Sequence, residues 1–453
     1  MQQHEQCLNV RAALMGLALL GTAAPGPALA EAVLAWNVTG FAATEAGGQN
    51  NPRISRSLAM LHLAIHDALN ALDRRYEPYL YMPRQSFPPG LEGASDRAIA
   101  ADAAVAAAAR DVLVSVLAEG GTAEQRGKAR DIVEKAYAES TAKLPDGAPR
   151  RHGIGVGQAA AAALITQRQA DGANLASEYT PSLAAGRWRP HPNPVPPDPP
   201  VADPRLAAGF WPAMLPHWGR VAPFMLLAPW QFRLGGPPEL AGADYARDYE
   251  EVKRLGGKLS SERNAEQSEI ARYWYEGSPQ SWSRIGRVLA AERALDRWEA
   301  ARLLALLNAA IADGFIAGFD TRYVYDFWRP VTAIRAGDAD GNDATLAEPG
   351  WESFLNTPPI PDYPSTHSIA GGAAATVLMH LFGNDQIAFA MTSGPPFAGI
   401  TRTFTHFSAA AQENALSRIY AGIHFRSACR DGVALGKDIG RRAVAQHLQP
   451  YRP

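Results

Sequence analysis

Segments rich in alanine and leucine, interrupted by scattered charges and free of proline, follow one another along this chain. This pattern is typical of amphipathic or buried helices. It covers residues 54–72, 98–117, 123–142 and 155–170 in the first half, and residues 239–255, 262–276, 298–320, 368–382, 409–420 and 430–448 in the second half. No stretch alternates with the period of a β-strand, and no internal repeat is present. The pattern therefore predicts an all-α fold.

A proline-rich region separates the two sets of helices. Residues 190–204 contain eight prolines, which hold a backbone in extended or turn-like conformations. Large aromatic side chains such as Trp188, Trp211 and Phe224 flank the prolines, and a free tether would not need them. We therefore expect a long loop, rich in proline and glycine, that wraps around the body. We assign residues 31–236 to an N-terminal helical layer with this loop and residues 237–453 to a C-terminal helical bundle.

Composition narrows the class of protein. Of the 453 residues, 47% are hydrophobic, and 43 basic residues nearly balance 45 acidic ones, which leaves a net charge of −2. These values exclude a disordered chain and a nucleic-acid binder that relies on bulk positive charge. Any anion must be recognised by a local cluster of side chains.

The first thirty residues resemble a secretory signal. Arg11 supplies a positive charge, residues 12–20 form an apolar stretch, and residues 28–30 read Ala-Leu-Ala, a small-x-small cleavage site. We therefore predict a signal peptide over residues 1–30 and a periplasmic or secreted mature protein. Cys429 would then be the single cysteine of the mature chain, without an internal disulfide. The mature chain contains no uncharged apolar run long enough for a membrane span.

Candidate chemistry is concentrated in three short segments after residue 320. The first carries Arg322 and Arg329, seven residues apart, which on one helix would share a face. The second is residues 364–367, Pro-Ser-Thr-His, at the start of an expected helix whose free N–H groups would favour an anion. The third places Arg418 six residues before His424. Three guanidinium groups, a set of N–H donors and two imidazoles suit a tetrahedral or trigonal oxyanion.

In this order and with these gaps, the three segments resemble the three-part signature shared by vanadium-dependent haloperoxidases and type 2 phosphatidic-acid-type phosphatases. The resemblance to soluble bacterial haloperoxidase-like proteins extends over most of the mature chain, including residues 66–70 and 403–404. It implies two packed helical bundles with the site in the C-terminal one. A homodimer is compatible with this resemblance.

The resemblance also implies a role for each site residue. It assigns the oxygens of vanadate, or of phosphate in the same pocket, to five residues: Arg322, Arg329, Ser365, the N–H of Thr366, and Arg418. His424 would be the axial partner, either as the ligand of the vanadium or as the nucleophile that forms a phosphohistidine. His367 would be the acid/base group. Arg322 would also be catalytic.

Two activities follow from the same residues, and the sequence leaves both open. The first is a haloperoxidase that uses hydrogen peroxide to oxidise a halide at the vanadate. Bromide is favoured over chloride, because Ile360 stands where some chloride-oxidising relatives carry an aromatic residue. The second is an exported acid phosphatase that hydrolyses phosphomonoesters. A third interpretation is a helical protein that binds an oxyanion without turnover.

Three positions depart from the family pattern. Arg322 replaces the usual lysine, and a planar fork is not equivalent to a compact ammonium group. Thr366 replaces a glycine, which removes tolerance for positive φ. Ala428 replaces an aspartate that would orient His424. We consider Asp431 and Glu413 as substitutes for that carboxylate.

Two further patterns are better explained by structure than by metal binding. His62 and His66 lie four residues apart, as zinc ligands on a helix can, but we expect a packed or hydrogen-bonded pair. Residues 338–343 are similar to part of a calcium loop, yet Pro349 occupies the position where such a loop needs a glutamate. We interpret this segment as an Asp/Gly turn.

Overall fold

The computed structural model describes residues 30–83, 87–193, 204–207 and 209–452. Helices dominate this part of the chain, so the predicted all-α fold is confirmed, with one exception: a two-stranded antiparallel hairpin that the sequence pattern did not reveal. The predicted signal peptide falls almost entirely on residues 1–29, which lie outside the described residues.

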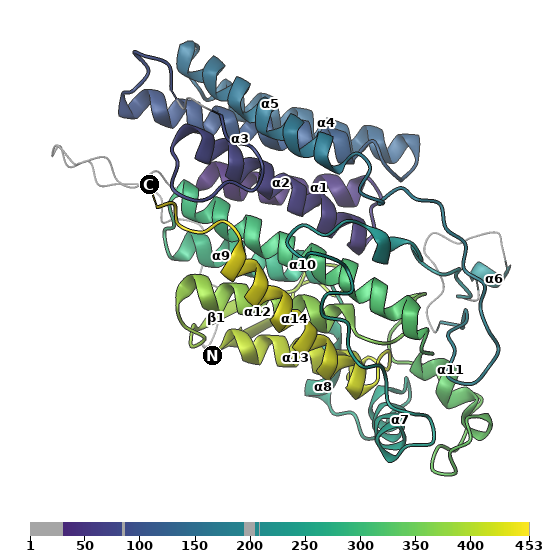
Figure 1. The fold of residues 1–453 in the computed structure, drawn as a ribbon. Coiled ribbons are helices and arrows are strands. Elements are labelled where there is room, and N and C mark those ends of the chain that lie inside the picture. The colour runs from purple at the N-terminus through teal and green to yellow at the C-terminus, as the bar shows by residue number, and fades with distance from the viewer. Residues whose placement is uncertain (1–29, 84–86, 194–203, 208, 453) are drawn as a thin grey trace, which may run out of the picture.

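The helices form two layers (Figure 1). The N-terminal layer contains α1 (Glu31–Ala46), α2 (Asn51–Leu72), α3 (Ala94–Val116), α4 (Ala123–Ala142) and α5 (Ala148–Arg168). Short helices α6 (Pro204–Ala207) and η1 (Trp218–Arg220) lie in the connecting region. The C-terminal part contains α7 (Ala243–Gly256), α8 (Ala265–Tyr273), α9 (Ser278–Glu292), α10 (Arg297–Tyr325), α11 (Pro330–Arg335), η2 (Gly337–Ala339), α12 (Thr366–Phe382), β1 (Phe389–Thr392), β2 (Thr401–Phe404), α13 (Phe407–Tyr420) and α14 (Arg426–Gln446).

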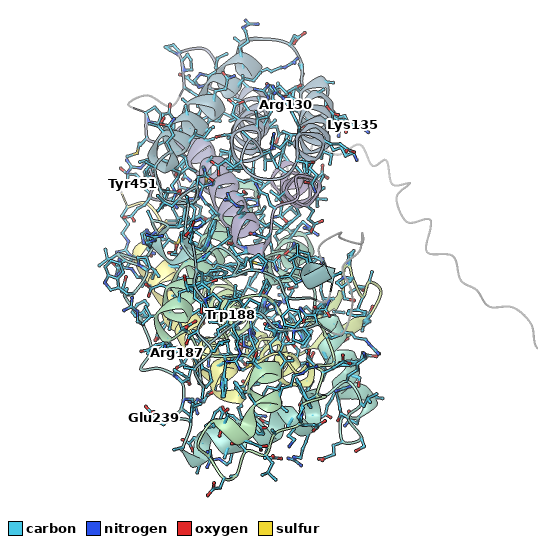
Figure 2. All side chains as sticks on the ribbon, turned by 90° about the vertical axis from the view of Figure 1, so that its right-hand side faces the viewer. Arg130, Lys135, Arg187, Trp188, Glu239 and Tyr451 are labelled. Carbon is cyan, nitrogen blue, oxygen red and sulfur yellow. The ribbon has the colours of Figure 1, made fainter. Side chains whose placement is uncertain are left out.

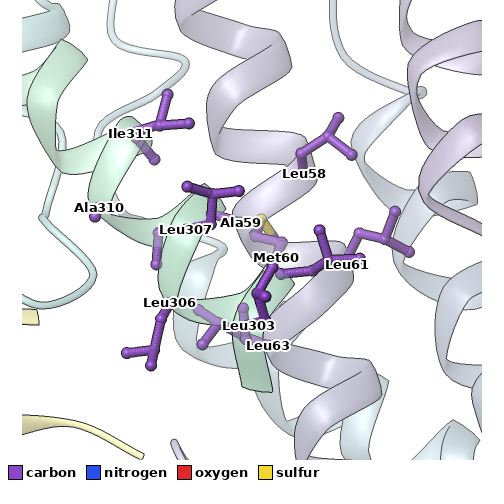
Figure 3. Close-up of a cluster of buried hydrophobic side chains, with 14 of the residues drawn as sticks. Leu58, Ala59, Met60, Leu61, Leu63, Leu303, Leu306, Leu307, Ala310 and Ile311 are labelled. Carbon is purple, nitrogen blue, oxygen red and sulfur yellow. The ribbon is translucent and has the colours of Figure 1, made fainter. Parts of the chain in front are cut away.

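Helix α10 is the centre of the molecule, packed between α2 of the first layer and α12 of the second. Leu303 and Leu307 of α10 lie near Met60 and Ala59 of α2 (Figure 3). Among the described residues, α10 alone is long and apolar enough to cross a membrane, but 94% of that segment is buried inside the protein. Its apolar character is thus accounted for by its contacts with both layers. Charged side chains such as Arg130 and Lys135 project from the outer side of α4 (Figure 2).

Glycines allow α12 and α14 to approach closely. A Cβ at Gly436 of α14 would lie 2.1 Å from the carbonyl oxygen of Ile369, and one at Gly432 would lie 2.8 Å from the carbonyl oxygen of Ser365. Real Cβ atoms do not approach backbone atoms this closely, so both positions require glycine. This contact positions the first turn of α12, which carries part of the candidate site.

The connecting region packs on the body, as predicted for its described part. Trp188, Trp218 and Phe224 are buried, and the carboxylate of Asp313 in α10 accepts N–H bonds from the backbone of residues 224–226 at 2.7 to 2.9 Å. A buried carboxylate with three donors holds this segment against the central helix. Residues 194–203, which contain five of the prolines, lie outside the described residues.

The side chains of the two candidate metal motifs contact other groups in the described part of the chain. The Nε2 atom of His62 lies 2.8 Å from Nδ2 of Asn37, and the side chain of His66 contacts Asp67 and Asn70. The carboxylate of Asp340 accepts the hydroxyl of Thr345 within a turn. No group of three or more potential metal-ligating side chains occurs in the described ranges.

Candidate active site

Residues from five elements line one cavity of about 280 Å³ in the C-terminal part. Arg322 comes from the last turn of α10, Arg329 from the N-cap of α11, and Arg418 from the last turn of α13. The cavity lining includes six of the seven predicted site residues: Arg322, Arg329, Thr366, His367, Arg418 and His424. The predicted cluster therefore forms, although its members are up to 102 residues apart in sequence.

Arg322 and Arg329 do not share a helix, which corrects the sequence prediction. Helix α10 ends at Tyr325, because Asp326 adopts the left-handed conformation with φ 53°. The hydroxyl of Tyr179 donates a 2.6 Å hydrogen bond to the carboxylate of Asp326 and supports this turn. The chain then reverses direction, and both arginines reach the cavity from different elements. Spacing alone could not show this, because an αL aspartate carries no strong sequence signal.

The three guanidinium groups are buried, with relative exposures of 1% or less. Backbone carbonyls hold them: Arg322 donates to Pro364 and Pro361, Arg329 to Ile360 and Ile423, and Arg418 to Trp274, over 2.7 to 3.1 Å. Among the described residues, Nη2 of Arg329 and Nε of Arg418 have no hydrogen-bond partner. Burial lowers the pKa of Arg329 and of Arg418 to about 10, so both remain cationic at neutral pH.

His424 has a defined tautomer. Its Nε2 atom lies 2.9 Å from Nη1 of Arg329, and since a guanidinium can only donate, Nε2 must offer its lone pair. Its Nδ1 atom lies 2.8 Å from Oδ1 of Asp362, a carboxylate that favours the Nδ1–H form. Burial and the neighbouring arginines lower the pKa of His424. The ring is therefore neutral and presents an unprotonated Nε2 atom to the cavity.

Asp362 is the carboxylate that lies against the ring of His424, with Oδ1 2.8 Å from Nδ1, and the sequence did not indicate this contact. The predicted substitutes were wrong: Asp431 accepts the hydroxyl of Tyr363, and Glu413 binds Trp274 and Arg402. Asp362 is fully buried, and burial raises its pKa to about 7 although nearby Arg329 and Arg322 oppose this shift. An acidic residue between Pro361 and Tyr363, three positions before Ser365, was the available signal.

His367 also has a defined proton position. Its Nε2 atom lies 3.2 Å from the carbonyl oxygen of Glu276, which can only accept a hydrogen bond. Burial and the charge of Arg418 lower the pKa of His367 well below the usual value. The neutral ring thus carries its proton on Nε2, and Nδ1 is free to accept one, as an acid/base group requires.

The N-terminus of α12 supplies fewer donors than the sequence predicted. The N–H of Ser365 donates to the carbonyl of Ala428 at 2.9 Å, and its side chain caps the helix by accepting from Ser368. Ser365 does not line the cavity. The N–H groups of Thr366 and His367 occupy the first turn, where a helix offers no internal partner. Of the three N–H groups of residues 365–367, those of Thr366 and His367 are therefore available to an anion.

Thr366 fits its position without strain. Its backbone is helical rather than of positive φ, so the Cβ that replaces a glycine hydrogen costs nothing in conformation. A Cβ at Gly318 would lie 3.0 Å from Cγ2 of Thr366. The extra methyl group is therefore accommodated by a glycine on the facing helix α10.

The rest of the cavity lining was not predicted. Its partly exposed members form the mouth: Asn50, Asn51, Met214 and Pro358. Pro52 of α2, Phe315 and Phe319 of α10, and Ile360 line the cavity as buried side chains. Most of these side chains are apolar. The N-terminal layer thus closes one side of a site whose charged groups all come from the C-terminal part.

The charges and donors fit a small oxyanion. Three buried guanidinium groups face a single buried carboxylate, which leaves an excess of positive charge in a region of low dielectric constant. Unpaired N–H groups on Arg329 and Arg418 and the helix N-terminus need an acceptor. Vanadate and phosphate both supply several acceptor oxygens and negative charge. The lone pair of His424 Nε2, which faces Nη1 of Arg329 in this structure, would bond to the central atom once that arginine donates to the oxyanion instead.

Comparisons with known proteins agree with this geometry. Residues 31–203 match the family model for the vanadium chloroperoxidase N-terminal domain, and residues 302–452 match the model for the VCPO second helical-bundle domain. The vanadium chloroperoxidase of Curvularia inaequalis is 26% identical over 492 residues, covering 88% of this chain and 80% of that protein.

Two solved structures show the same fold. A bacterial vanadium-dependent iodoperoxidase has a TM-score of 0.74 at 24% identity, covering 95% of this chain and 100% of that one. An apo-type bacterial vanadium-dependent chloroperoxidase has a TM-score of 0.66 at 18% identity, covering 87% of this chain and 93% of that one.

Proposed function

Since the chain belongs to the vanadium haloperoxidase family, we propose that it uses hydrogen peroxide to oxidise a halide at a vanadate held by His424. One observation carries this proposal: the Nε2 atom of His424 lies beside buried guanidinium groups in a single cavity. A metal needs the lone pair of a neutral imidazole, and an oxyanion needs the guanidinium donors. The site provides both.

Different residues would bind the oxygens and the metal of vanadate. Arg322, Arg329 and Arg418 would donate to vanadate oxygens, together with the N–H groups at the start of α12. His424 would bind the metal through Nε2, and Asp362 would keep its proton on Nδ1. When bound, vanadate supplies a Lewis acid that activates hydrogen peroxide.

His367 would accept and return a proton of hydrogen peroxide. Its Nε2–H is fixed on the carbonyl of Glu276, so Nδ1 accepts the proton that hydrogen peroxide loses on binding and later returns it. The lowered pKa keeps this ring neutral before peroxide arrives. The carbonyl contact also holds the ring in one orientation, which is what a proton shuttle needs.

We also propose bromide as the preferred halide over chloride. The buried apolar side chains of Phe315, Phe319 and Ile360 in the cavity lining support this preference, because a halide must lose water to enter and the larger anion loses it at lower cost. The ratio of bromide to chloride turnover under equal conditions tests it. A ratio below one would contradict it.

The test of the main proposal is bromination of a chromogenic acceptor by vanadate-loaded protein with peroxide and bromide. We expect turnover in the wild type and none in His424→Ala. His380→Ala is the matched control, because His380 is exposed at the other end of α12 and should retain full activity. Equal turnover in wild type and His424→Ala would refute the site assignment.

Phosphomonoester hydrolysis is the alternative activity. The contact between Asp362 and His424 also suits this activity, because a carboxylate near Nδ1–H increases the nucleophilicity of Nε2. Hydrolysis of a phosphomonoester, inhibited by vanadate and lost in His424→Ala, would support this activity. Absence of hydrolysis in protein that brominates would exclude it.

We further propose that the protein is exported. The Ala-Leu-Ala motif at residues 28–30 and the start of α1 at Glu31 support cleavage at this point. The mass of protein recovered from the periplasm or medium tests it. Protein found there should begin at Glu31, and an uncleaved cytoplasmic chain would contradict the proposal.

A further inference from the structure

One side chain at the cavity mouth contains sulfur. Met214 lines the same cavity as Arg322, His367 and His424, and among the described lining residues it is the only one with a thioether or thiol. Its own N–H donates to the carbonyl of Pro359 at 2.9 Å, and its carbonyl accepts the hydroxyl of Tyr323 at 2.7 Å. Both backbone contacts fix Met214 at the mouth.

The position of Met214 exposes it to any oxidant made in the cavity. One molecule confined to about 280 Å³ corresponds to an effective concentration of about 6 M. A thioether is a soft nucleophile that oxidises readily, whereas the phenylalanine, proline, isoleucine and asparagine side chains of the lining are far less reactive. The imidazoles of His367 and His424 also react with hypohalous acid, but Met214 is the lining residue whose oxidation by oxygen transfer gives a stable product.

We propose that Met214 is the primary oxidative modification site of this protein, converted to methionine sulfoxide by the hypohalous acid formed in its own cavity. This inference rests on the proposed haloperoxidase function. With bromide as the halide, the sulfur attacks the bromine of hypobromous acid, an S–Br bond forms, and hydroxide leaves. Water then attacks the sulfur and bromide leaves, so sulfur loses two electrons, bromine gains two, and one net proton is released.

Cys429 is not a competing target. Its side chain is 3% exposed and faces a different groove, between α13 and α14. Burial raises the pKa of its thiol to about 12, so the reactive thiolate is essentially absent at neutral pH. The sulfur of Met214 thus has no competing sulfur near the site among the described residues.

Oxidation of Met214 would slow turnover. A sulfoxide places a polar, less flexible group among the apolar side chains of Phe319 and Ile360. Entry of halide or acceptor through the mouth would then be slower. A methionine sulfoxide reductase, which acts on this modification as a class, would reverse it.

Met82 offers an internal control. It is 47% exposed and lies outside the cavity lining, whereas Met60, Met225 and Met391 are at most 5% exposed. Hypobromous acid added from solution should therefore oxidise Met82 before Met214. Hypobromous acid made inside the cavity should reverse this order.

The experiment measures peptide masses after a fixed number of turnovers with vanadate, peroxide, bromide and a chromogenic acceptor. We expect Met214 to gain one oxygen before Met82 during turnover, and Met82 first when hypobromous acid is added to His424→Ala. Met214→Leu should lengthen the half-life of activity, relative to its own initial rate, at least twofold, and Met82→Leu should not change it.

The outcomes separate the inference from the proposed function. Bromination of the acceptor with Met214 unmodified, or with Met82 oxidised first, would overturn the inference and leave the haloperoxidase function intact. Absence of bromination would refute the proposed function and the inference together. Oxidation of Met214 by peroxide without bromide would show that hypohalous acid is not the agent.

Discussion

Arg418→Met distinguishes a binding arginine from a structural one, because the two roles predict opposite effects on stability. Arg418 is 1% exposed, and burial lowers its pKa from 12.5 to about 10. Because this pKa is lower in the folded chain, the fold disfavours the charged guanidinium by about 3 kcal/mol relative to the unfolded chain. Without an anion, the guanidinium is therefore a destabilising group.

The substitution removes this cost and also removes the hydrogen bond from the charged Nη1 group to the carbonyl of Trp274, which contributes about 2 kcal/mol. The net gain is about 1 kcal/mol. For a chain of this length, unfolding entropy converts that gain into a rise of about 1 °C in the melting temperature. We expect this rise in a buffer that contains no multivalent anion.

Phosphate is a stable probe of the site. It should stabilise the wild type more than Arg418→Met. Loss of charge-assisted bonds from Arg418 weakens anion binding at least tenfold, so the stabilisation by saturating phosphate falls by at least about 1.4 kcal/mol. Thermal unfolding of wild type and variant, with and without phosphate, measures both effects.

Arg302→Met is the matched control, because Arg302 is a partly buried arginine outside the cavity that donates to the carbonyl of Leu448. The rise in melting temperature that phosphate causes in Arg302→Met should equal the rise in the wild type. If Arg418→Met lowers the melting temperature without anion, or leaves the phosphate-induced shift unchanged, the assignment of Arg418 to anion binding is wrong.

Three further predictions follow from other contacts. Asp362→Asn should weaken vanadate binding about 10- to 100-fold. Nitrogen NMR of His424 should then show loss of the pure Nδ1–H tautomer, and an unchanged spectrum would exclude a positioning role for Asp362. Burial lowers the pKa of His62 to about 3, so the unfolded chain takes up a proton below pH 6.5 and the folded chain does not, and stability is lost as pH falls from 6.5 toward 3. Between pH 7 and pH 5, the free energy of unfolding should fall by about 2 kcal/mol less in His62→Gln than in the wild type. Denaturant unfolding at the two pH values measures this difference, and equal losses would contradict this pKa. Gly436→Ala should destabilise the fold by 1 to 3 kcal/mol or more, because its Cβ would meet a backbone oxygen of α12 at 2.1 Å, while Gly155→Ala, whose Cβ meets nothing within 4 Å, should not.

The sequence predicted most helices, since proline-free apolar periodicity extends over long segments. It missed α1 and α9, and the hairpin of β1 and β2 whose strands have four residues each. The strands are too short for alternation to be distinguished from chance.

The site was predicted in part, and the failures have physical causes. The three arginines and two histidines were identified because their order along the chain resembles a known signature. The turn at Asp326, the partner of His424 and the apolar lining of the cavity depend on contacts between distant segments, such as Asp362 with His424. No local pattern encodes such contacts. The carboxylates considered from the sequence lie near His424 along the chain, whereas Asp362 precedes α12 and reaches His424 only in the folded chain.

Vanadate titration of the wild type and of His424→Ala tests the central claim most directly, because it asks whether the Nε2 atom of His424 completes the oxyanion site. The account predicts one vanadate per chain in the wild type, displaced by phosphate, and at least tenfold weaker binding in His424→Ala with no change in His380→Ala. Equal vanadate affinity in wild type and His424→Ala would contradict it.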